Sequence, residues 1–267
     1  MSYGISIHGD NGNLVIDENS AAFEFIGSFT PIEDRLAPKG LEAFAVDDLW
    51  VWTHWVDVSS PDGRPLVFLD IPFGPAVGLT GNGAAVIGVK LQPSGLWRVF
   101  LVVALGYTAP TIRCFAELKT PSTDQFGMRI HRADNSLVFD SGKKMLWVRH
   151  LGDIETKAAY TMSSSSLDEA EPTKNTQVDL TSLGDLSQYA ICCYTRPMCF
   201  RSNTTAHKAT FYHWVYSYDG AVLQGRWTRS YKASFSGSLH TGEGTYSATD
   251  REHYVREFAL IDKAAFT

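Results

Sequence analysis

The chain has 267 residues, of which 44% are hydrophobic and 19% are charged, as is typical of a globular protein with a sizeable core. Its formal net charge of −6 and the lack of any Lys/Arg run argue against a nucleic-acid partner, because such proteins neutralise phosphates with clustered basic residues. The longest apolar run, 99–105, is far shorter than the roughly 20 residues that a helix needs to cross a bilayer. We therefore expect no nucleic-acid partner and no membrane span.

The first predicted element is a β-hairpin over Tyr3–Asp17. Ile5 and Ile7 alternate with polar residues, as expected of a strand with one buried face. The pair Asn11-Gly12 separates this run from a second apolar run. Asn-Gly between two such runs is the strongest short hairpin signal, because both turn residues take positive φ. The chain is therefore expected to open with two short antiparallel strands.

Many further short strands are expected along the chain. The turn pairs Asp62-Gly63, Asn82-Gly83 and Asp219-Gly220 lie between apolar or aromatic runs such as 65–71 and 84–91. No long segment shows the 3.6-residue period of an amphipathic helix. Short strands separated by turn signals predict an all-β fold, either a sandwich or a barrel, and we favour a sandwich.

A second version of the opening hairpin follows the polar loop 119–125, 123 positions after the first. It spans Phe126–Asp140, and six of its fifteen residues are identical to the first version in an alignment without gaps. We therefore predict two β-sandwich-like domains, 1–122 and 123–267, each opening with a similar hairpin. The second is expected to contain a polar loop near 163–176, because this stretch has few apolar residues.

Three residues of each hairpin are assigned to its scaffold. An aromatic residue anchors the first strand, a glycine lets another backbone approach, and an aspartate caps the turn after the second strand. These residues are Tyr3, Gly4 and Asp17 in the first hairpin and Phe126, Gly127 and Asp140 in the second. His8 and His131 occupy equivalent positions, and we interpret both as surface or half-buried histidines.

The sequence contains no motif of a known catalytic or cofactor site. In the glycine-rich stretch 74–88 the third glycine of a dinucleotide fingerprint is replaced by Val86, and the chain lacks the P-loop, G-x-S-x-G and H-E-x-x-H motifs. The four cysteines lack the spacing of a zinc site, so we interpret them as buried free thiols. We expect no catalytic, cofactor-binding or metal-binding residues and no enzyme. Spacing alone does not exclude a hydrolase with two carboxylates across a sugar cleft.

Two runs place several large aromatic residues on one face of a strand, because alternate side chains share a face. They are Trp50 and Trp52 in the run 50–55, and Tyr212, Trp214, Tyr216 and Tyr218 in the run 210–218. Such rings can form the core of a sheet, since aromatic residues carry much of the buried area of a sandwich. They can also form a protein interface or stacking platforms for sugars, and the three interpretations stay open.

The opening hairpin resembles the start of small tail-tip and baseplate proteins of long-tailed bacteriophages. The shared features are an initial Met, a small residue, Tyr-Gly followed by a hydrophobic residue, an alternating strand, an Asn-Gly turn and the sequence LVID at 14–17. The resemblance covers about fifteen residues at each of two places. It carries over no functional residues beyond the hairpin itself.

This resemblance implies a non-enzymatic structural protein of the virion tail, assembled in the cytoplasm of the bacterial host. It would act as an adaptor between tail components or between the tail and a fibre. Its partners would be other tail or baseplate proteins and a tail fibre, and we expect a homo-oligomer, either a trimer or a hexamer. The alternative is a receptor- or carbohydrate-binding β-module in which Trp50, Trp52, Tyr212 and Trp214 stack on sugars.

Overall fold

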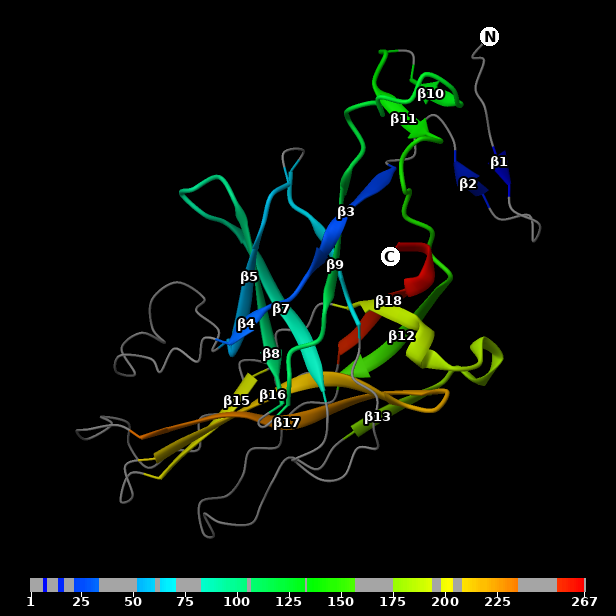
Figure 1. The fold of residues 1–267 in the computed structure, drawn as a ribbon. Helices are drawn as coiled ribbons and strands as arrows, with labels where there is room; N and C mark the ends of the chain where they lie inside the picture. Colours follow the sequence, from blue (N-terminus) through cyan, green and yellow to red (C-terminus); the bar gives the residue numbers. More distant parts are fainter. Residues whose placement is uncertain are drawn as a thin grey trace.

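A computed structural model of the chain shows an all-β protein (Figure 1). It describes residues 7–8, 14–16, 22–33, 52–60, 63–70, 83–104, 107–132, 134–156, 175–193, 198–203, 208–234 and 254–266. Up to residue 122 the strands are β1 (Ile7–His8), β2 (Leu14–Ile16), β3 (Phe23–Phe29), β4 (Ile32–Glu33), β5 (His54–Val58), β6 (Leu66–Leu69), β7 (Ala84–Leu91), β8 (Trp97–Val103) and β9 (Ile112–Glu117).

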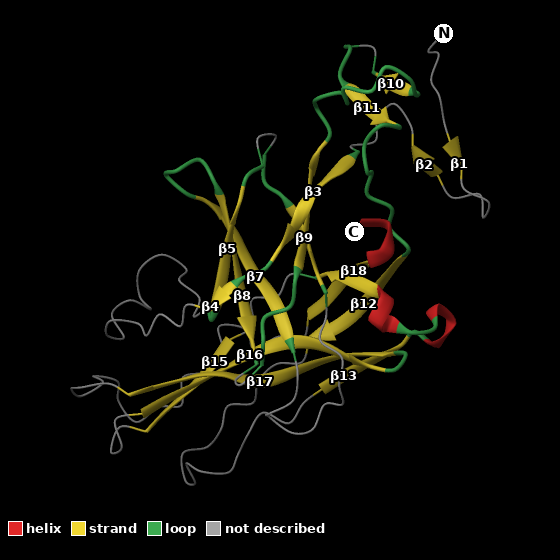
Figure 2. Ribbon diagram, in the orientation of Figure 1, coloured by secondary structure: helices red, strands yellow, loops and turns green. Residues whose placement is uncertain are grey.

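The later strands are β10 (Arg129–His131), β11 (Leu137–Asp140), β12 (His150–Thr156), β13 (Asn175–Asp179), β14 (Tyr189–Cys192), β15 (Met198–Asn203), β16 (Lys208–Asp219), β17 (Val222–Ser234) and β18 (Tyr254–Asp262). The helical segments of the described residues are three short 3-10 turns (Figure 2), namely η3 (Thr181–Leu183), η4 (Leu186–Gln188) and η5 (Lys263–Phe266).

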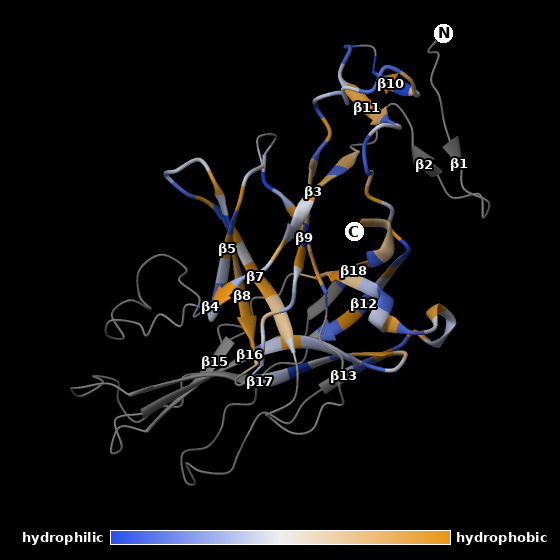
Figure 3. Cartoon of the chain, in the orientation of Figure 1, coloured by the Kyte–Doolittle hydropathy of each residue, from blue (hydrophilic) through white to orange (hydrophobic). Residues whose placement is uncertain are grey.

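Two large antiparallel sheets form a sandwich. One sheet has six strands in the order β12-β18-β14-β6-β9-β3. The other has the order β13-β17-β16-β7-β8-β5-β4, and β15 pairs with β16 beside this path. The buried apolar residues between the sheets come from both of them, including Val67 and Leu260 of the first and Leu101 and Trp214 of the second. Strands β7 and β8 are among the most hydrophobic parts of the described chain (Figure 3). The predicted all-β, sandwich-like fold is therefore confirmed.

The two halves of the chain contribute the same strand pattern to both sheets. In the six-stranded sheet the order from edge to centre is β3-β9-β6 in the first half and β12-β18-β14 in the second. In the larger sheet it is β5-β8-β7 and β13-β17-β16. The halves meet where Leu69 pairs with Ile191 and where Ala84 pairs with Tyr216. Within the described residues, each half is thus a hairpin followed by seven strands, six of which are wound in the same way, and the two strands outside this correspondence are β4 and β15.

The boundary predicted between residues 122 and 123 falls in the loop between β9 and β10, which separates these two equivalent halves. It does not separate two cores, because both sheets and the main buried cluster run through both halves. Whether the halves fold as independent domains stays a prediction. Residues 119–125 contain no strand, as predicted. In the predicted polar loop, Asn175 and Thr176 begin β13, and 163–174 lie outside the described residues.

The six-stranded sheet curls so that its outer strand β3 also meets the segment leading into β12. The amide of Phe25 donates to the carbonyl of Lys144 at 2.8 Å, and the amide of Leu146 donates to the carbonyl of Phe23 at 2.7 Å. A second apolar cluster fills the concave face, where the ring of Phe266 lies 4.9 Å from that of Phe115.

The two hairpins form separate two-stranded sheets, β1-β2 and β10-β11. In the view of Figure 2, β10-β11 lies above β3 and β1-β2 lies to its right. Their pairing corresponds residue by residue. Ile7 pairs with Ile16 as Ile130 pairs with Phe139, and His8 pairs with Leu14 as His131 pairs with Leu137. Both registers shift at the same place, just before the histidine. The short sequence similarity therefore coincides with one shared backbone arrangement.

Candidate protein-binding hairpin

The turn of the β10–β11 hairpin is held by local hydrogen bonds. The amide of Arg132 donates to the carbonyl of Ser136 at 2.9 Å, and the amide of Asn135 donates to the carbonyl of Arg132 at 3.0 Å. Asn135 has a φ of 66°, a left-handed conformation that asparagine tolerates better than most residues. The Asp134 carboxylate accepts hydrogen bonds from the amide and hydroxyl of Ser136. Asp134 and Asn135 thus shape the turn between the two strands.

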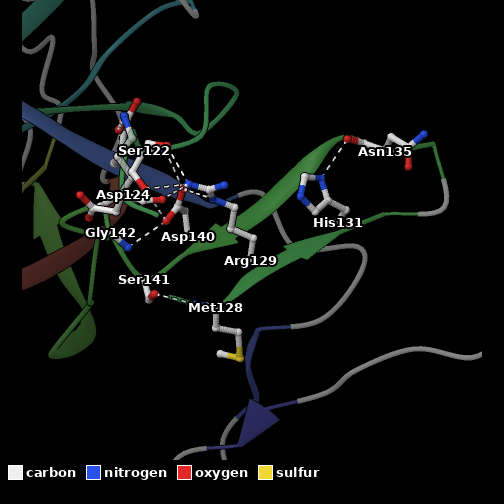
Figure 4. A network of polar contacts seen from close by, with 11 residues as sticks. Ser122, Asp124, Met128, Arg129, His131, Asn135, Asp140, Ser141 and Gly142 are labelled. Atoms are coloured by element: carbon white, nitrogen blue, oxygen red, sulfur yellow. Dashed lines mark hydrogen bonds and ion pairs between the residues drawn. The ribbon is translucent and has the colours of Figure 1, made fainter. Parts of the chain in front are cut away.

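The base of the hairpin is organised around the Asp140 carboxylate (Figure 4). This side chain is 2% exposed. Its Oδ1 accepts from the Ser122 hydroxyl at 3.0 Å and the Gly142 amide at 2.8 Å. Its Oδ2 accepts from the Ser122 amide at 2.7 Å and from Nε of Arg129 at 3.1 Å. Asp140 therefore caps the turn after the second strand, as predicted, and also ties the hairpin to the loop that precedes it.

The charge of Asp140 is stabilised by these donors. Burial acts to raise the pKa of Asp140, but the hydrogen bonds from Ser122, Gly142 and Arg129 outweigh it and lower the pKa from 3.8 to about 2. Arg129 also donates from Nη2 to the carbonyls of Ser122 at 2.7 Å and Asp124 at 2.9 Å. The guanidinium thus joins the strand, the aspartate and the preceding loop in one network.

Gly127 is required by a close approach at the base of the hairpin. Its φ is +144°, and a Cβ at this position would lie 2.5 Å from Oγ of Ser141. Oγ of Ser141 accepts from the amide of Met128 at 2.8 Å, and the amide of Ser141 donates to the carbonyl of Met128 at 3.0 Å. The group that approaches Gly127 is therefore the side chain of Ser141, whereas the sequence predicted an approaching backbone.

Phe126 does not anchor the strand, and this prediction is wrong for the second hairpin. Its side chain is 90% exposed, and Met128 two residues later is 49% exposed. The buried apolar residues of the hairpin are instead Ile130, Leu137 and Val138. The hairpin therefore presents an aromatic and a thioether side chain to solvent from a base that the Asp140 network holds in place. Large exposed apolar side chains on a supported hairpin are typical of protein-binding surfaces.

A cavity of about 270 Å³ lies between this hairpin and the end of β9. Its charged and ionisable lining residues are Glu117, Lys119, His131 and Arg132. Glu117 and Lys119 form an ion pair at 3.6 Å. His131 is exposed, as predicted, and its Nδ1 lies 3.1 Å from the carbonyl oxygen of Asn135. The volume falls just below the range of typical small-molecule sites.

The predicted scaffold residues of the first hairpin, Tyr3, Gly4 and Asp17, lie outside the described residues. The backbone pairing of β1 and β2 is described, and it matches that of β10 and β11. By sequence position Tyr3 corresponds to the exposed Phe126.

The aromatic run of β16 lies in the core where its side chains are described. Trp214 and Tyr216 are 0% exposed and Tyr218 is 2% exposed, so none of the three offers a surface for a sugar or a partner in the single chain. Trp52 is half-buried and its ring lies 4.8 Å from that of Phe100. Trp50 and the side chain of Tyr212 lie outside what the structure describes.

The sequence reasoning missed Arg129, Ser122 and Ser141. The signal for Arg129 was available, because a hairpin register places a residue near 129 opposite Asp140 and opposite charges across a strand pair attract. No such signal exists for Ser122, since its contact with Asp140 depends on how the loop folds back.

No family model, curated protein or solved structure matches the chain. Within the described ranges, no group of three or more His, Cys, Asp or Glu side chains is placed to hold a metal ion. No helix in the part of the chain that the structure describes is long and apolar enough to cross a membrane.

Proposed function

We propose that the protein is a non-enzymatic structural component of a bacteriophage tail tip or baseplate. It acts as an adaptor between tail components or between the tail and a fibre, and it is assembled in the cytoplasm of the bacterial host. The hairpin β10–β11 is the contact element of this adaptor. The observation that carries the proposal is the exposure of Phe126 and Met128 on a hairpin whose base is locked by Asp140.

A rigid support favours binding because it lowers the entropy lost on association. The Asp140 network ties both strands of the hairpin to the loop before it, so the apolar side chains are presented without an ordering step. The first hairpin has the same backbone pairing and carries Tyr3 and Ile5 at the corresponding sequence positions. One chain would thus offer two similar contact elements, as an adaptor between neighbouring subunits requires.

The test is to locate the chain in phage particles. Quantitative mass spectrometry of purified particles of the phage that encodes it should find the chain in a fixed ratio to other tail proteins. Immunogold labelling should place it at the distal end of the tail. If the chain is made during infection but is missing from purified particles, the proposal is wrong.

A pair of variants tests the hairpin itself. Phage encoding Phe126→Ser together with Met128→Ser should assemble particles that lack the chain, because the apolar contact is removed. The matched control is Leu91→Ser, which changes a side chain that is 52% exposed at the end of β7, and these particles should retain the chain. Equal incorporation of both variants would contradict a contact role for the hairpin.

A further inference from the structure

The strand β12 lies at an open edge of the six-stranded sheet. It pairs with β18 over its whole length, from His150 opposite Leu260 to Thr156 opposite Tyr254. Among the described residues no strand pairs with its other side along 150–156. Such an edge leaves alternate backbone N–H and C=O groups without ladder partners, and it can therefore accept another strand.

This edge carries exposed apolar side chains. Leu151 is 71% exposed, and Trp147 and Val148, just before the strand, are 49% and 44% exposed. Natural proteins usually blunt a sheet edge with charged residues, proline or a bulge. A leucine exposed to this degree beside open backbone groups is the pattern of an edge that is covered by another strand.

The charges around Leu151 are arranged with opposite signs. Arg149 lies two residues before Leu151 and Asp153 two residues after it, and both are exposed. Within the described part of the chain neither side chain has an ion-pair partner. Asp153 also lies directly opposite Glu257 of β18. Because like charges opposite each other destabilise a strand pair, this carboxylate pair favours the approach of a cation from the open side.

One pairing of two copies satisfies all of these groups. In an antiparallel pair centred on Leu151, each Leu151 faces the partner's Leu151. Residues two positions to either side then face each other, so Arg149 lies opposite the partner's Asp153 and Asp153 opposite the partner's Arg149. A parallel pair would place Arg149 opposite the partner's Arg149. An antiparallel pair centred on Asp153 would bring together two further carboxylates.

We propose that β12 pairs with β12 of a second copy of this chain, in an antiparallel register centred on Leu151. The contact is isologous, so it produces a twofold dimer and joins the two six-stranded sheets into one continuous sheet. The expected hexamer is compatible with this contact as three such dimers, whereas an isolated trimer is not. The proposal does not depend on the hairpin or on the proposed place in a phage tail.

The experiment measures the mass of the purified full-length chain by light scattering on the size-exclusion peak, from low concentration to about 100 μM. The wild type should be a dimer, or a hexamer that Leu151→Lys converts to a trimer. Leu151→Lys should raise the dimer dissociation constant by at least about tenfold, because it places two ammonium groups together at the centre of the contact. Leu91→Lys, at an exposed leucine of another strand, should leave the mass unchanged.

A charge exchange tests the register. Arg149→Asp and Asp153→Arg should each weaken the dimer, because each places like charges opposite one another twice in the pair. The double variant Arg149→Asp/Asp153→Arg should restore the wild-type mass, while circular dichroism verifies that every variant is folded. A wild type that is a monomer or a trimer over this range overturns the proposal. A dimer that Leu151→Lys leaves intact also overturns it. So does a double variant that dimerises no more strongly than the two single variants.

Discussion

Replacing Asp140 by asparagine should loosen the β10–β11 hairpin without unfolding the sandwich. The substitution keeps the shape of the side chain but turns one acceptor oxygen into an NH2 donor. In the native protein each carboxylate oxygen accepts two hydrogen bonds, one pair from Ser122 and Gly142 and the other from Ser122 and Arg129. With the NH2 at the Oδ1 position, the bond from the Gly142 amide is lost, while the Ser122 hydroxyl turns to accept. With the NH2 at the Oδ2 position, the bonds from the Ser122 amide and from Arg129 are both lost.

The size of the effect follows from these contacts. Hydrogen bonds to a charged group contribute about 1.5–3 kcal/mol each. The amide takes the orientation that loses least, in which the bond from the Gly142 amide is lost, so we expect a loss of about 2 kcal/mol for local opening of the hairpin. Because 1.36 kcal/mol corresponds to a factor of ten, the open state should become about thirtyfold more populated.

Amide hydrogen exchange by NMR measures this opening directly. The amide of Ser141 is bonded to the carbonyl of Met128 across the hairpin, and its protection should fall by the expected thirtyfold. The amide of Ala104, bonded to Gly83 in the sandwich, should keep its protection. Asp134→Asn is the matched control, because this exposed carboxylate accepts from Ser136 at the turn and takes no part in the network at the base. Unchanged protection of Ser141 in Asp140→Asn would refute the reasoning.

Three further predictions concern pH, the hairpin glycine and the concave core. The lowered pKa of Asp140 means that its ionised form stabilises the hairpin above pH 4, and this contribution should disappear as the pH falls from about 4 to about 2, as the exchange rate of the Ser141 amide should show. Gly127→Val should disrupt the β10–β11 hairpin because its Cβ would meet Oγ of Ser141 at 2.5 Å. Gly95→Val is the control, because no atom lies near the Cβ position of this turn glycine and the variant adds backbone strain without a clash. Equal protection of the β10–β11 hairpin in the two variants would contradict the prediction. Phe266→Ala should lower the free energy of unfolding by about 3–5 kcal/mol, because the ring is 2% exposed. Urea unfolding measures this loss. A loss below about 1 kcal/mol would show that the aromatic cluster is not tightly packed.

The local elements could be predicted from the sequence, and the contacts between distant strands could not. Alternating residues and Asn-Gly or Asx-rich turns indicated both hairpins, and the repeated motif indicated that the chain has two equivalent halves. Leu69 pairs with Ile191 on a strand far away in the chain, and the local pattern of neither strand predicts its pairing partner. Sheet pairing depends on which edges remain open after each half has formed, which is a property of the tertiary fold.

The candidate site shows the same division. The turn-capping role of Asp140 was predicted because it depends on the hairpin backbone alone. At Gly127 a close approach was predicted, but the approaching group, the side chain of Ser141, was not. Phe126 was assigned as an anchor because aromatic residues usually pack, but alternation does not say which side of an isolated two-stranded sheet faces the molecule. Trp214 and Tyr216 lie in the core because β16 is a central strand of the larger sheet, a position that the sequence does not reveal.

The matching strand order of the two halves has a consequence for how the chain can be divided and rejoined. The halves meet through neighbouring strands, β6 with β14 and β7 with β16, through the hydrogen bonds between β3 and the segment before β12, and through the shared apolar core. The covalent link between them is the loop around residue 122. A protease cut or a split gene at this loop would leave two fragments whose open edges are complementary. Fragments 1–122 and 123–267 should therefore reassociate, as two subunits of a heterodimer do, with the covalent connection serving to keep the two at high effective concentration.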